Sequence, residues 1–234
     1  MTTPLHIGIV ACSAEGASLC YRTICTEGPA LLGQAHAHPE ISMHTPSLAD
    51  YIACLGRGDL PGVADLMLHS AGKLKQAGAD FLICPDNTIH QALPLVLPRS
   101  PLPWLHIAEV VAEEAVQRGY RKLALTGTRW LVESEVYPAA LGDRGIGFMR
   151  PEERERIRHN RIIMDELVMG VFLPESVAAF RRSIERMQRE GCDAVVLGCT
   201  EIPLIIDERN SPLPVLDSTR LLARAALKKA IAGK

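Results

Sequence analysis

Short apolar runs alternate with longer stretches of helical period along the whole chain. Four apolar runs end in small or polar residues, and they are predicted to be buried strands: His6–Ala11, Phe81–Cys84, Leu123–Leu125 and Ala194–Leu197. Short runs flanked by Gly and Pro are typical of parallel strands that are covered on both faces. Four stretches carry apolar residues at helical spacing: Val63–Ala77, Ala108–Arg118, Glu152–Met169 and Glu175–Glu190. The alternation of strand and helix predicts an α/β fold with mainly parallel sheets.

The two halves of the chain resemble each other. The segment "KQAGADFLICPDNT", which begins at Lys75, aligns with "QREGCDAVVLGCTE", which begins at Gln188, and this alignment places Asp86 on Cys199. The segment "PLPWLHI" parallels "PLPVLDS", and "HIGIVACS" parallels "KLALTGTR", in the same order along each half. Three ordered matches predict two similar lobes, although α/β proteins also reuse one strand–turn–helix pattern widely.

We therefore expect an N-terminal lobe of residues 1–103 and 211–234 and a second lobe of residues 104–210. A pseudo-twofold axis would relate the two lobes. Asp86 and Cys199 would then lie at the carboxyl ends of equivalent strands and face one cleft. Open α/β sheets bind their ligands at the carboxyl ends of the strands.

Composition narrows the class of protein. The 234 residues are 47% hydrophobic, which is sufficient for a full core. A net charge of −2 and an aromatic content of 4% argue against nucleic acid and anionic membranes as partners. No apolar run approaches the roughly 20 residues of a membrane span, and no signal peptide is expected. Seven cysteines without a CxxC pair indicate reduced thiols in a cytoplasmic protein rather than metal ligands.

Polar residues follow three of the predicted strands. Asn87 and Thr88 follow one strand, Thr200 and Glu201 follow another, and Ser13 follows the first. A turn between a strand and a helix leaves backbone N–H groups unpaired, and these groups attract anions together with the helix dipole. Three such turns around one cleft would hold a carboxylate without an arginine, and the same field would favour the thiolate of Cys199.

Two proton-transfer groups on opposite walls of one cleft would invert a stereocentre. A carbon held between Asp86 and Cys199 could lose a proton to one group and regain a proton from the other. This reaction needs no cofactor if the site stabilises an enolate-like intermediate, and N–H donors directed at a carboxylate would do so.

Two motifs carry a resemblance to a known family. "CPDNTIH" and "GCTEIPLI" are similar to the two signatures of the Asp/Glu racemase family, in its aspartate racemase branch. "IGIVACSAEGASLCYRTI", "GTRWLVESEVY" and "GIGFMRPEERERIRHNRIIMDELVMGVF" resemble further segments of that family, so the resemblance spans nearly the whole chain.

The resemblance implies two α/β lobes with an active site between them and a homodimer. It also implies racemisation of a small-molecule substrate, usually an acidic amino acid, without pyridoxal phosphate or a metal. Cys199 is the catalytic thiol by this resemblance. The positions that match substrate-contacting or signature residues are Ser13, Asn87, Thr88, His90, Thr200 and Glu201.

The first catalytic cysteine of the family is absent, and Asp86 occupies its place. A carboxylate can accept and return a proton, but its reference pKa of about 3.9 makes it a weak base. Burial would raise that pKa and turn N–H donors would lower it, so the direction stays open and the pair would work asymmetrically. Cys84 is a less favoured substitute for the missing thiol, because a short apolar strand is a common home for an inert cysteine.

A second departure concerns charge. Some family members carry cations where this chain has Tyr51 and Met169, and cations there would bind a side-chain carboxylate. The prediction of an acidic substrate is therefore weakened, and another amino acid or a related carbonyl acid is an alternative substrate. Thr45 is a further candidate for the substrate-binding region, with a surface hydroxyl as the alternative.

Structural roles stay open for several polar residues. His90 would either orient the site or cap its helix, and Glu201 would either hold the second signature together or cap the helix that follows. The charge-rich segment "EERERIRHNR" is predicted to be a solvated helix face with i,i+4 ion pairs.

Three functions compete. The leading hypothesis is a racemase in which Cys199 and Asp86 act on opposite faces of the substrate Cα. A second hypothesis is a single-cysteine decarboxylase of the arylmalonate type, which needs no opposing base. A third is a catalytically degenerate relative that binds an amino acid without turning it over.

Overall fold

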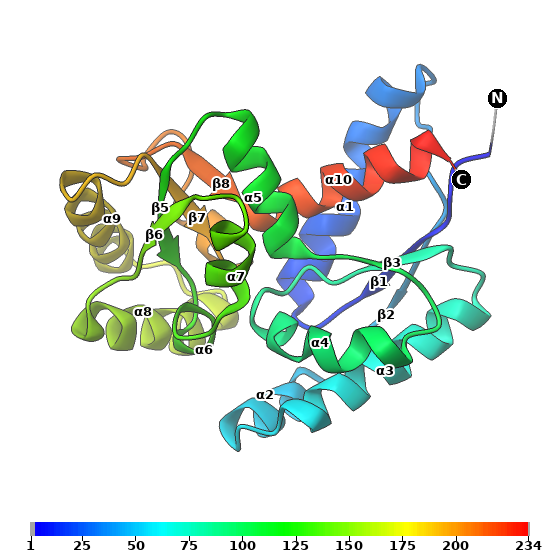
Figure 1. Ribbon diagram of the computed structural model, residues 1–234, viewed down its shortest axis with the longest axis horizontal. Coiled ribbons are helices and arrows are strands. Elements are labelled where there is room, and N and C mark those ends of the chain that lie inside the picture. Colours follow the sequence, from blue (N-terminus) through cyan, green and yellow to red (C-terminus); the bar gives the residue numbers. More distant parts are fainter. Residues whose placement is uncertain (1–2, 234) are drawn as a thin grey trace. The chain divides into compact units, whose positions relative to one another are not determined.

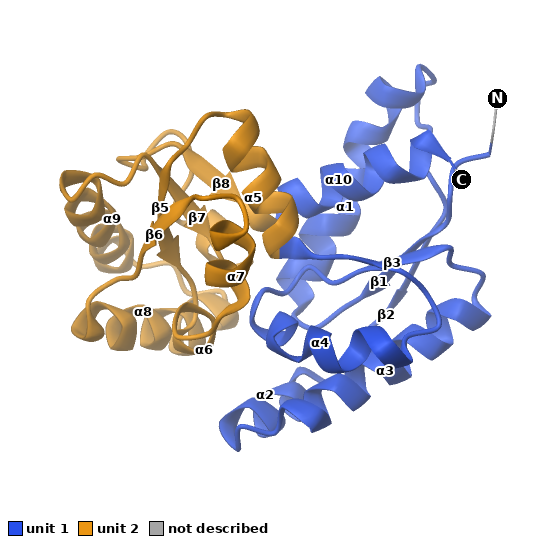
Figure 2. Cartoon of the chain, in the orientation of Figure 1, with its two compact units in different colours: residues 1–107, 219–234 blue, residues 108–218 orange. Residues whose placement is uncertain are grey.

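The computed structural model describes residues 3–233 and divides the chain into two compact units. Unit 1 comprises residues 1–107 and 219–234, and unit 2 comprises residues 108–218 (Figure 2). The predicted lobe boundaries at 103 and 210 fall a few residues earlier. The difference arises because Trp104–Leu105 form a strand of the sheet in unit 1 and the segment around Val215 forms a strand of the sheet in unit 2.

Unit 1 is built on a four-stranded parallel sheet of order β2-β1-β3-β4. Its strands are β1 (Ile7–Val10), β2 (Ile41–His44), β3 (Phe81–Ile83) and β4 (Trp104–Leu105). The helices α1 (Ala14–Leu32) and α10 (Ser218–Ala232) lie on one side of the sheet, and α2 (Leu48–Gly56), α3 (Leu60–Gln76) and α4 (Leu93–Val96) lie on the other (Figure 1). Two 3₁₀ helices, η1 (Thr88–Ala92) and η2 (Leu97–Arg99), flank α4.

Unit 2 repeats this architecture with a parallel sheet of order β6-β5-β7-β8. Its strands are β5 (Lys122–Thr126), β6 (Gly147–Met149), β7 (Ala194–Leu197) and β8 (Val215–Asp217). The helices α8 (Glu153–Asp165) and α9 (Pro174–Arg189) cover one face, and α5 (Ile107–Gln117) and α7 (Val136–Gly142) cover the other (Figure 1). The short elements are α6 (Arg129–Val132), η3 (Leu167–Met169) and η4 (Ile202–Leu204).

The internal repeat predicted from the sequence is present in the hydrogen bonding of both units. The Asp80 carboxylate at the start of β3 accepts from the backbone N–H of His6 at 2.8 Å, and Asp193 at the start of β7 accepts from that of Arg121 at 2.7 Å. These bonds tie each strand to its neighbour in the sheet. The equivalent strands β3 and β7 therefore carry Asp86 and Cys199 beyond their carboxyl ends.

Burial explains why the core strands form where the pattern predicts them. Every residue of β1, β3 and β7 is buried, so a helical layer covers each face of the sheet. In unit 2, the side chains of Val195 and Leu197 belong to one apolar cluster with Phe180 and Ile184 of α9. In residues 3–233, no helix combines the length and the apolar character that a membrane crossing requires.

Candidate active site

The carboxyl edge of the sheet in unit 1 collects most of the predicted binding residues. Because the strands are parallel, the loops after β1, β2 and β3 leave from the same edge. Ser13 follows β1 and caps α1, since its Oγ accepts a hydrogen bond from the backbone N–H of Gly16 at 3.2 Å. Thr45 follows β2 and is exposed. Ser13 therefore leaves from the strand next to β3, whereas Thr45 leaves from β2, which lies one strand further away along the same edge.

Asp86 opens that turn and is held by it. Its Oδ1 accepts a hydrogen bond from the backbone N–H of Ile89 at 3.1 Å, which fixes the carboxyl group at the start of η1. Asn87 and Thr88 are buried beside it, whereas Asp86 is only partly buried. A partly exposed carboxyl group on a buried turn has the access that proton exchange with a ligand requires.

His90 fastens the same turn to the rest of unit 1. Its side chain is 1% exposed, and its Nε2 accepts a hydrogen bond from the backbone N–H of Ile107 at 3.3 Å. The ring proton therefore resides on Nδ1, which donates to the backbone carbonyl of Asp86 at 2.6 Å. Burial, together with the neighbouring ring of His106, lowers the pKa of His90 to about 3. The neutral ring of His90 thus links the backbone of the Asp86 turn to the backbone of Ile107.

The buried neutral His90 makes a pH-dependent contribution to stability. Between pH 6.5 and pH 3 the unfolded chain binds a proton that the folded chain excludes, so the free energy of unfolding falls as the pH falls. Below pH 6, we expect a loss of about 1.4 kcal/mol per pH unit from this group. Urea unfolding of the wild type and of His90→Gln at pH 7, 6 and 5 measures it.

The variant should show a shallower decline of stability with acidity than the wild type. The pKa of His159 in unit 2 is also lowered by burial, to about 4, but His159 is present in both proteins and cancels from the difference. Equal slopes would contradict the assignment of a buried neutral ring to His90.

Two further side chains beneath the turn are inaccessible. Cys84 is fully buried, and burial followed by the negative charge of Asp86 raises the pKa of its thiol well above the usual value. Tyr51 is also fully buried, and burial raises the pKa of its hydroxyl. Neither group has the exposure that contact with a substrate requires, whereas the carboxyl group of Asp86 on this turn is partly exposed.

The turn after β7 holds the catalytic candidates of unit 2. Cys199 is 9% exposed, and its thiol donates a hydrogen bond to Oε2 of Glu201 at 2.9 Å. The hydroxyl of Thr200 donates to the same oxygen at 2.7 Å. Glu201 is itself 4% exposed, so a buried carboxylate faces a thiol. Glu201 is therefore positioned to take the proton of Cys199 and release a thiolate.

Gly198 allows this turn to approach β5 closely. A Cβ atom on Gly198 would lie 2.5 Å from the backbone carbonyl oxygen of Thr126 and 2.6 Å from Cδ2 of Leu131. The substitution Gly198→Ala should therefore lower the free energy of unfolding by about 2 kcal/mol, because a backbone atom cannot move aside cheaply. Denaturant unfolding measures this loss.

Gly72→Ala is the matched control for this substitution. Gly72 lies within α3, and a Cβ atom there would meet no atom within 4 Å. Alanine at this helical position should stabilise the protein by about 0.5 kcal/mol or more. If both alanine variants shift stability alike, steric crowding at Gly198 is not the cause.

One polar residue of unit 2 escaped the sequence analysis. Thr128 caps α6, since its Oγ1 accepts a hydrogen bond from the backbone N–H of Leu131 at 3.2 Å, and it is the structural counterpart of Ser13. The sequence parallel between "HIGIVACS" and "KLALTGTR" indicates that a residue equivalent to Ser13 exists in unit 2. It aligns Ser13 with Arg129, however, and not with Thr128. The loop after β5 is one residue shorter than the loop after β1, so the equivalent capping residue comes one position earlier.

The structure therefore assembles two sets of predicted residues, one at each sheet edge. Unit 1 contributes Ser13, Thr45, Asp86, Asn87, Thr88 and His90, and unit 2 contributes Cys199, Thr200 and Glu201. Within residues 3–233, none of the seven cysteines forms a disulfide bond. In residues 3–233, no three His, Cys, Asp or Glu side chains gather as a metal site would require.

Comparisons with known proteins identify the family of this chain and match its fold. A family model described as Asp/Glu/hydantoin racemase matches residues 9–226. The chain is 22% identical over 169 residues to the broad specificity amino-acid racemase RacX of Bacillus subtilis (strain 168), with 71% of each chain covered. The structure of this chain resembles that of a candidate Asp/Glu racemase from Yersinia pestis, with a TM-score of 0.88 and 31% identity. The comparison covers 97% of this chain and 99% of the other chain. An aspartate racemase homologue from Pyrococcus horikoshii OT3 gives a TM-score of 0.81 at 27% identity, with the same coverage.

Proposed function

Since this chain belongs to the Asp/Glu/hydantoin racemase family, we propose that it is an isomerase that racemises an amino acid by two-base proton transfer. The proposal assigns one base to each unit, Cys199 and Asp86. It requires neither pyridoxal phosphate nor a metal, because thiolate and carboxylate groups carry the proton transfers. The observation that carries the proposal is the hydrogen bond from the Cys199 thiol to the buried carboxylate of Glu201.

The reaction balances in both directions. Glu201 takes the thiol proton, and the Cys199 thiolate then removes the proton from one face of the substrate Cα. A protonated Asp86 delivers its proton to the opposite face, which yields the other enantiomer and the Asp86 carboxylate. In the reverse direction the Asp86 carboxylate removes the proton, the Cys199 thiol returns one, and the protonated Glu201 then gives its proton back to the Cys199 thiolate.

The substrate carboxylate would be bound by hydroxyl, amide and backbone N–H groups. We assign this role to Ser13, Asn87, Thr88 and Thr200, with Thr45 at the rim. Donors directed at the carboxylate stabilise the enolate-like intermediate, which carries more negative charge on these oxygens than the substrate does. The buried ring of His90 would hold the turn that carries Asp86, Asn87 and Thr88 in place.

We propose a substrate range that extends beyond aspartate and glutamate. Neither Tyr51 nor Met169 supplies a cation for a side-chain carboxylate, and Tyr51 is fully buried whereas Met169 is 73% exposed. A similar protein from B. subtilis is named a broad specificity amino-acid racemase, which is consistent with this proposal. The homodimer and the cytoplasmic location expected from the sequence belong to the same proposal.

Isotope exchange tests the proposed reaction. A single enantiomer of each amino acid in a panel that includes aspartate, glutamate and neutral residues is incubated with the protein in deuterated water. We expect both enantiomers to form with deuterium at Cα, detected by chiral chromatography and mass spectrometry. If no member of the panel shows inversion or exchange, the racemase proposal fails.

A single-cysteine decarboxylase is the second candidate, because only one of the two equivalent turns presents a thiol at the catalytic position. Carbon dioxide release from an arylmalonate, without racemisation of any amino acid in the panel, would favour this candidate. A protein that only binds an amino acid would show saturable binding with neither reaction.

The role of Glu201 is tested by its pH dependence. The substitution Glu201→Gln keeps the size of the side chain but removes the group that accepts the thiol proton. We expect kcat to fall about 10²-fold at neutral pH and the rising limb of the pH profile to move toward the ordinary thiol pKa of about 8.5. A pH profile that is unchanged in shape would show that Glu201 only holds the turn.

A further inference from the structure

A hollow in unit 2 lies apart from the turn that bears Cys199. It has a volume of about 540 Å³ and lies between α8 and the start of α9. Sites for small molecules typically measure about 300–1,000 Å³. The α8 side contributes Arg154, Ile157, Arg158 and Arg161 to the lining. Their spacing of i, i+3, i+4 and i+7 places all four side chains on one face of the helix.

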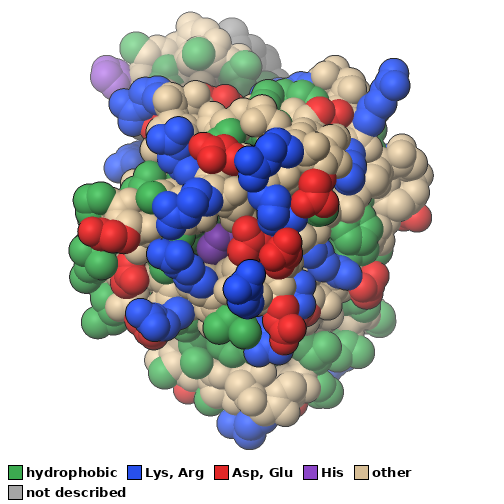
Figure 3. All heavy atoms as spheres, turned by 90° about the vertical axis from the view of Figure 1, so that its left-hand side faces the viewer, with side chains coloured by type: hydrophobic (Ala, Val, Ile, Leu, Met, Phe, Trp, Pro, Cys, Tyr) green, Lys and Arg blue, Asp and Glu red, His purple; other side chains and the backbone are tan. Residues whose placement is uncertain are grey.

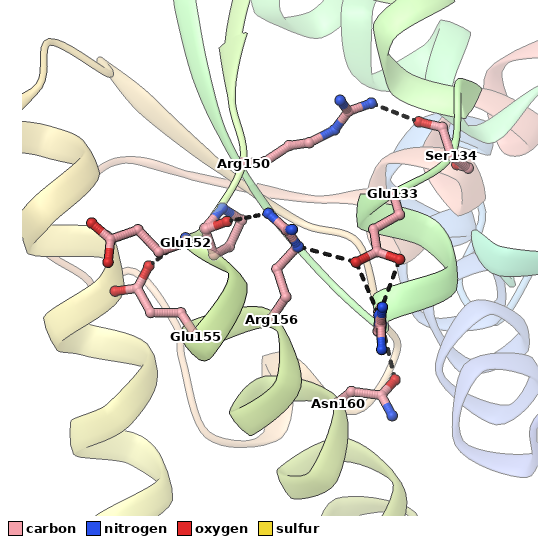
Figure 4. A network of polar contacts seen from close by, with 9 residues as sticks. Glu133, Ser134, Arg150, Glu152, Glu155, Arg156 and Asn160 are labelled. Atoms are coloured by element: carbon pink, nitrogen blue, oxygen red, sulfur yellow. Dashed lines mark hydrogen bonds and ion pairs between the residues drawn. The ribbon is translucent and has the colours of Figure 1, made fainter.

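Three arginines of this face have no partner, unlike the arginines around them. The guanidinium of Arg156 donates to Glu133 at 3.2 Å and to the carbonyl of Pro151 at 2.9 Å, and Arg150 donates to the carbonyl of Ser134 at 3.0 Å (Figure 4). Within residues 3–233, in contrast, the side chains of Arg154, Arg158 and Arg161 form no hydrogen bond or ion pair.

The expectation of i,i+4 ion pairs along this segment was wrong. The ion pairs of α8 run to other elements instead, as Arg156 contacts Glu133 and Glu155 contacts Arg186 of α9. Arg154 and Arg158 are themselves i,i+4 neighbours, and like charges at this spacing destabilise a helix. An anion bound in the hollow would relieve this repulsion.

The remainder of the lining is built by a fixed loop. The hydroxyl of Ser176 donates to the carboxylate of Glu166, which joins the end of α8 to the first turn of α9. The backbone N–H of Val171 donates to the carbonyl of Glu166 at 2.9 Å, and the φ angle of 72° at Gly170 reverses the chain between them. The loop side of the hollow is therefore held in place without a ligand, which reduces the entropic cost of binding.

We propose that this hollow binds a phosphorylated small molecule of nucleotide size. The guanidinium groups match phosphate oxygens in a bidentate geometry. The seven helical steps from Arg154 to Arg161 span about 10 Å of helix, which suits a chain of two or three phosphates better than a single carboxylate. Ile157 and Leu173 would contact the organic body, and Glu175 would accept hydrogen bonds from sugar hydroxyls.

The molecular surface around the hollow has a different distribution of charge. Figure 3 views the side of the molecule on which α8 and α9 lie, and Lys and Arg side chains are interleaved there with Asp and Glu. On a mixed surface most cations are neutralised by neighbouring acids, so a group of three unpaired arginines around a hollow differs from its surroundings. The partially exposed apolar side chains of Ile157 and Leu173 at the same place distinguish the hollow from a purely solvated charge surface.

Isothermal titration calorimetry with ATP, tripolyphosphate and adenosine at about 0.15 M salt tests this proposal. We expect saturable binding of ATP, weaker binding of tripolyphosphate, which lacks contacts to the apolar residues, and no binding of adenosine. The double variant Arg158→Gln/Arg161→Gln should lose at least about tenfold in affinity for ATP. The matched control is Arg182→Gln/Arg189→Gln, which removes two exposed arginines of α9 outside the hollow and should bind ATP as the wild type does.

Three results would overturn the proposal. They are the absence of saturable binding of ATP and tripolyphosphate up to millimolar concentration, an unchanged affinity in Arg158→Gln/Arg161→Gln, and an equal loss in both double variants. The four substituted side chains are exposed, so thermal unfolding should show that all variants fold like the wild type. Since Cys199 and Asp86 do not line the hollow, these outcomes are independent of the racemase proposal.

Discussion

Replacing Cys199 with alanine is expected to reduce racemisation at least about 10³-fold. The variant lacks the thiol that removes or returns the proton on one face of the substrate Cα, and proton transfer by a positioned side chain contributes about 10²–10⁴ to a rate. The loss should appear in kcat rather than in KM, because the hydroxyl and amide groups assigned to the substrate carboxylate remain. Chiral chromatography of single-enantiomer reactions measures both constants.

Cys192→Ala is the matched control for this variant. Cys192 is another buried thiol of unit 2, and it lies at the opposite end of β7 from Cys199. Its substitution should change stability modestly and leave kcat within about twofold, because it has no role in proton transfer. If Cys199→Ala retains the wild-type kcat, the thiol is not a catalytic base and the proposed mechanism is wrong.

The sequence pattern predicted the central strands of both sheets and missed the outer ones. β1 and β3 in unit 1, and β5 and β7 in unit 2, are covered on both faces and are therefore continuous apolar runs. Most residues of the outer strands are partly exposed, so these strands carry no comparable run. Both boundaries of the lobes were placed early because neither β4 nor β8 was recognised as a strand.

The long predicted helix Glu152–Met169 also differs in detail. α8 ends at Asp165, and a separate 3₁₀ turn ends at Gly170 in a left-handed conformation. Helical periodicity continues through this break, since the side chain of Leu167 stays on the buried face. The break matters for the hollow, because it turns the chain back toward α8 before α9 begins.

The equivalence of the two turns that carry the candidate residues could be predicted from the sequence, but their internal contacts could not. The motifs placed Asp86 and Cys199 on equivalent turns, and the shared strand order of the two units agrees with that placement. The tautomer of His90 depends on the backbone N–H of Ile107, which is 17 positions away along the chain. The contact between Cys199 and Glu201 depends on how the turn folds back, which residue types alone do not define.

Replacing Asp86 with asparagine is expected to cause the second large loss of racemisation. Asn at position 86 can still accept the hydrogen bond from Ile89, so Asp86→Asn should keep the turn, but the amide cannot carry a proton between steps. We expect racemisation to fall about 10²–10⁴-fold. Asp65→Asn, which neutralises an exposed carboxylate of α3, is the control and should leave the rate unchanged.

Deuterium exchange distinguishes the two bases within this experiment. In Asp86→Asn, Cys199 can still remove the proton of one enantiomer and return deuterium on the same face, so exchange without inversion is expected. In Cys199→Ala the complementary enantiomer should exchange slowly through Asp86 alone. Asp86→Cys restores a thiol on both turns, as in the family signature, and should racemise at least as fast as the wild type. If Asp86→Asn racemises the substrate as fast as the wild type, the Asp86 carboxyl group is not the second base. Another group would then have to act, because a single thiol cannot act on both faces of one carbon.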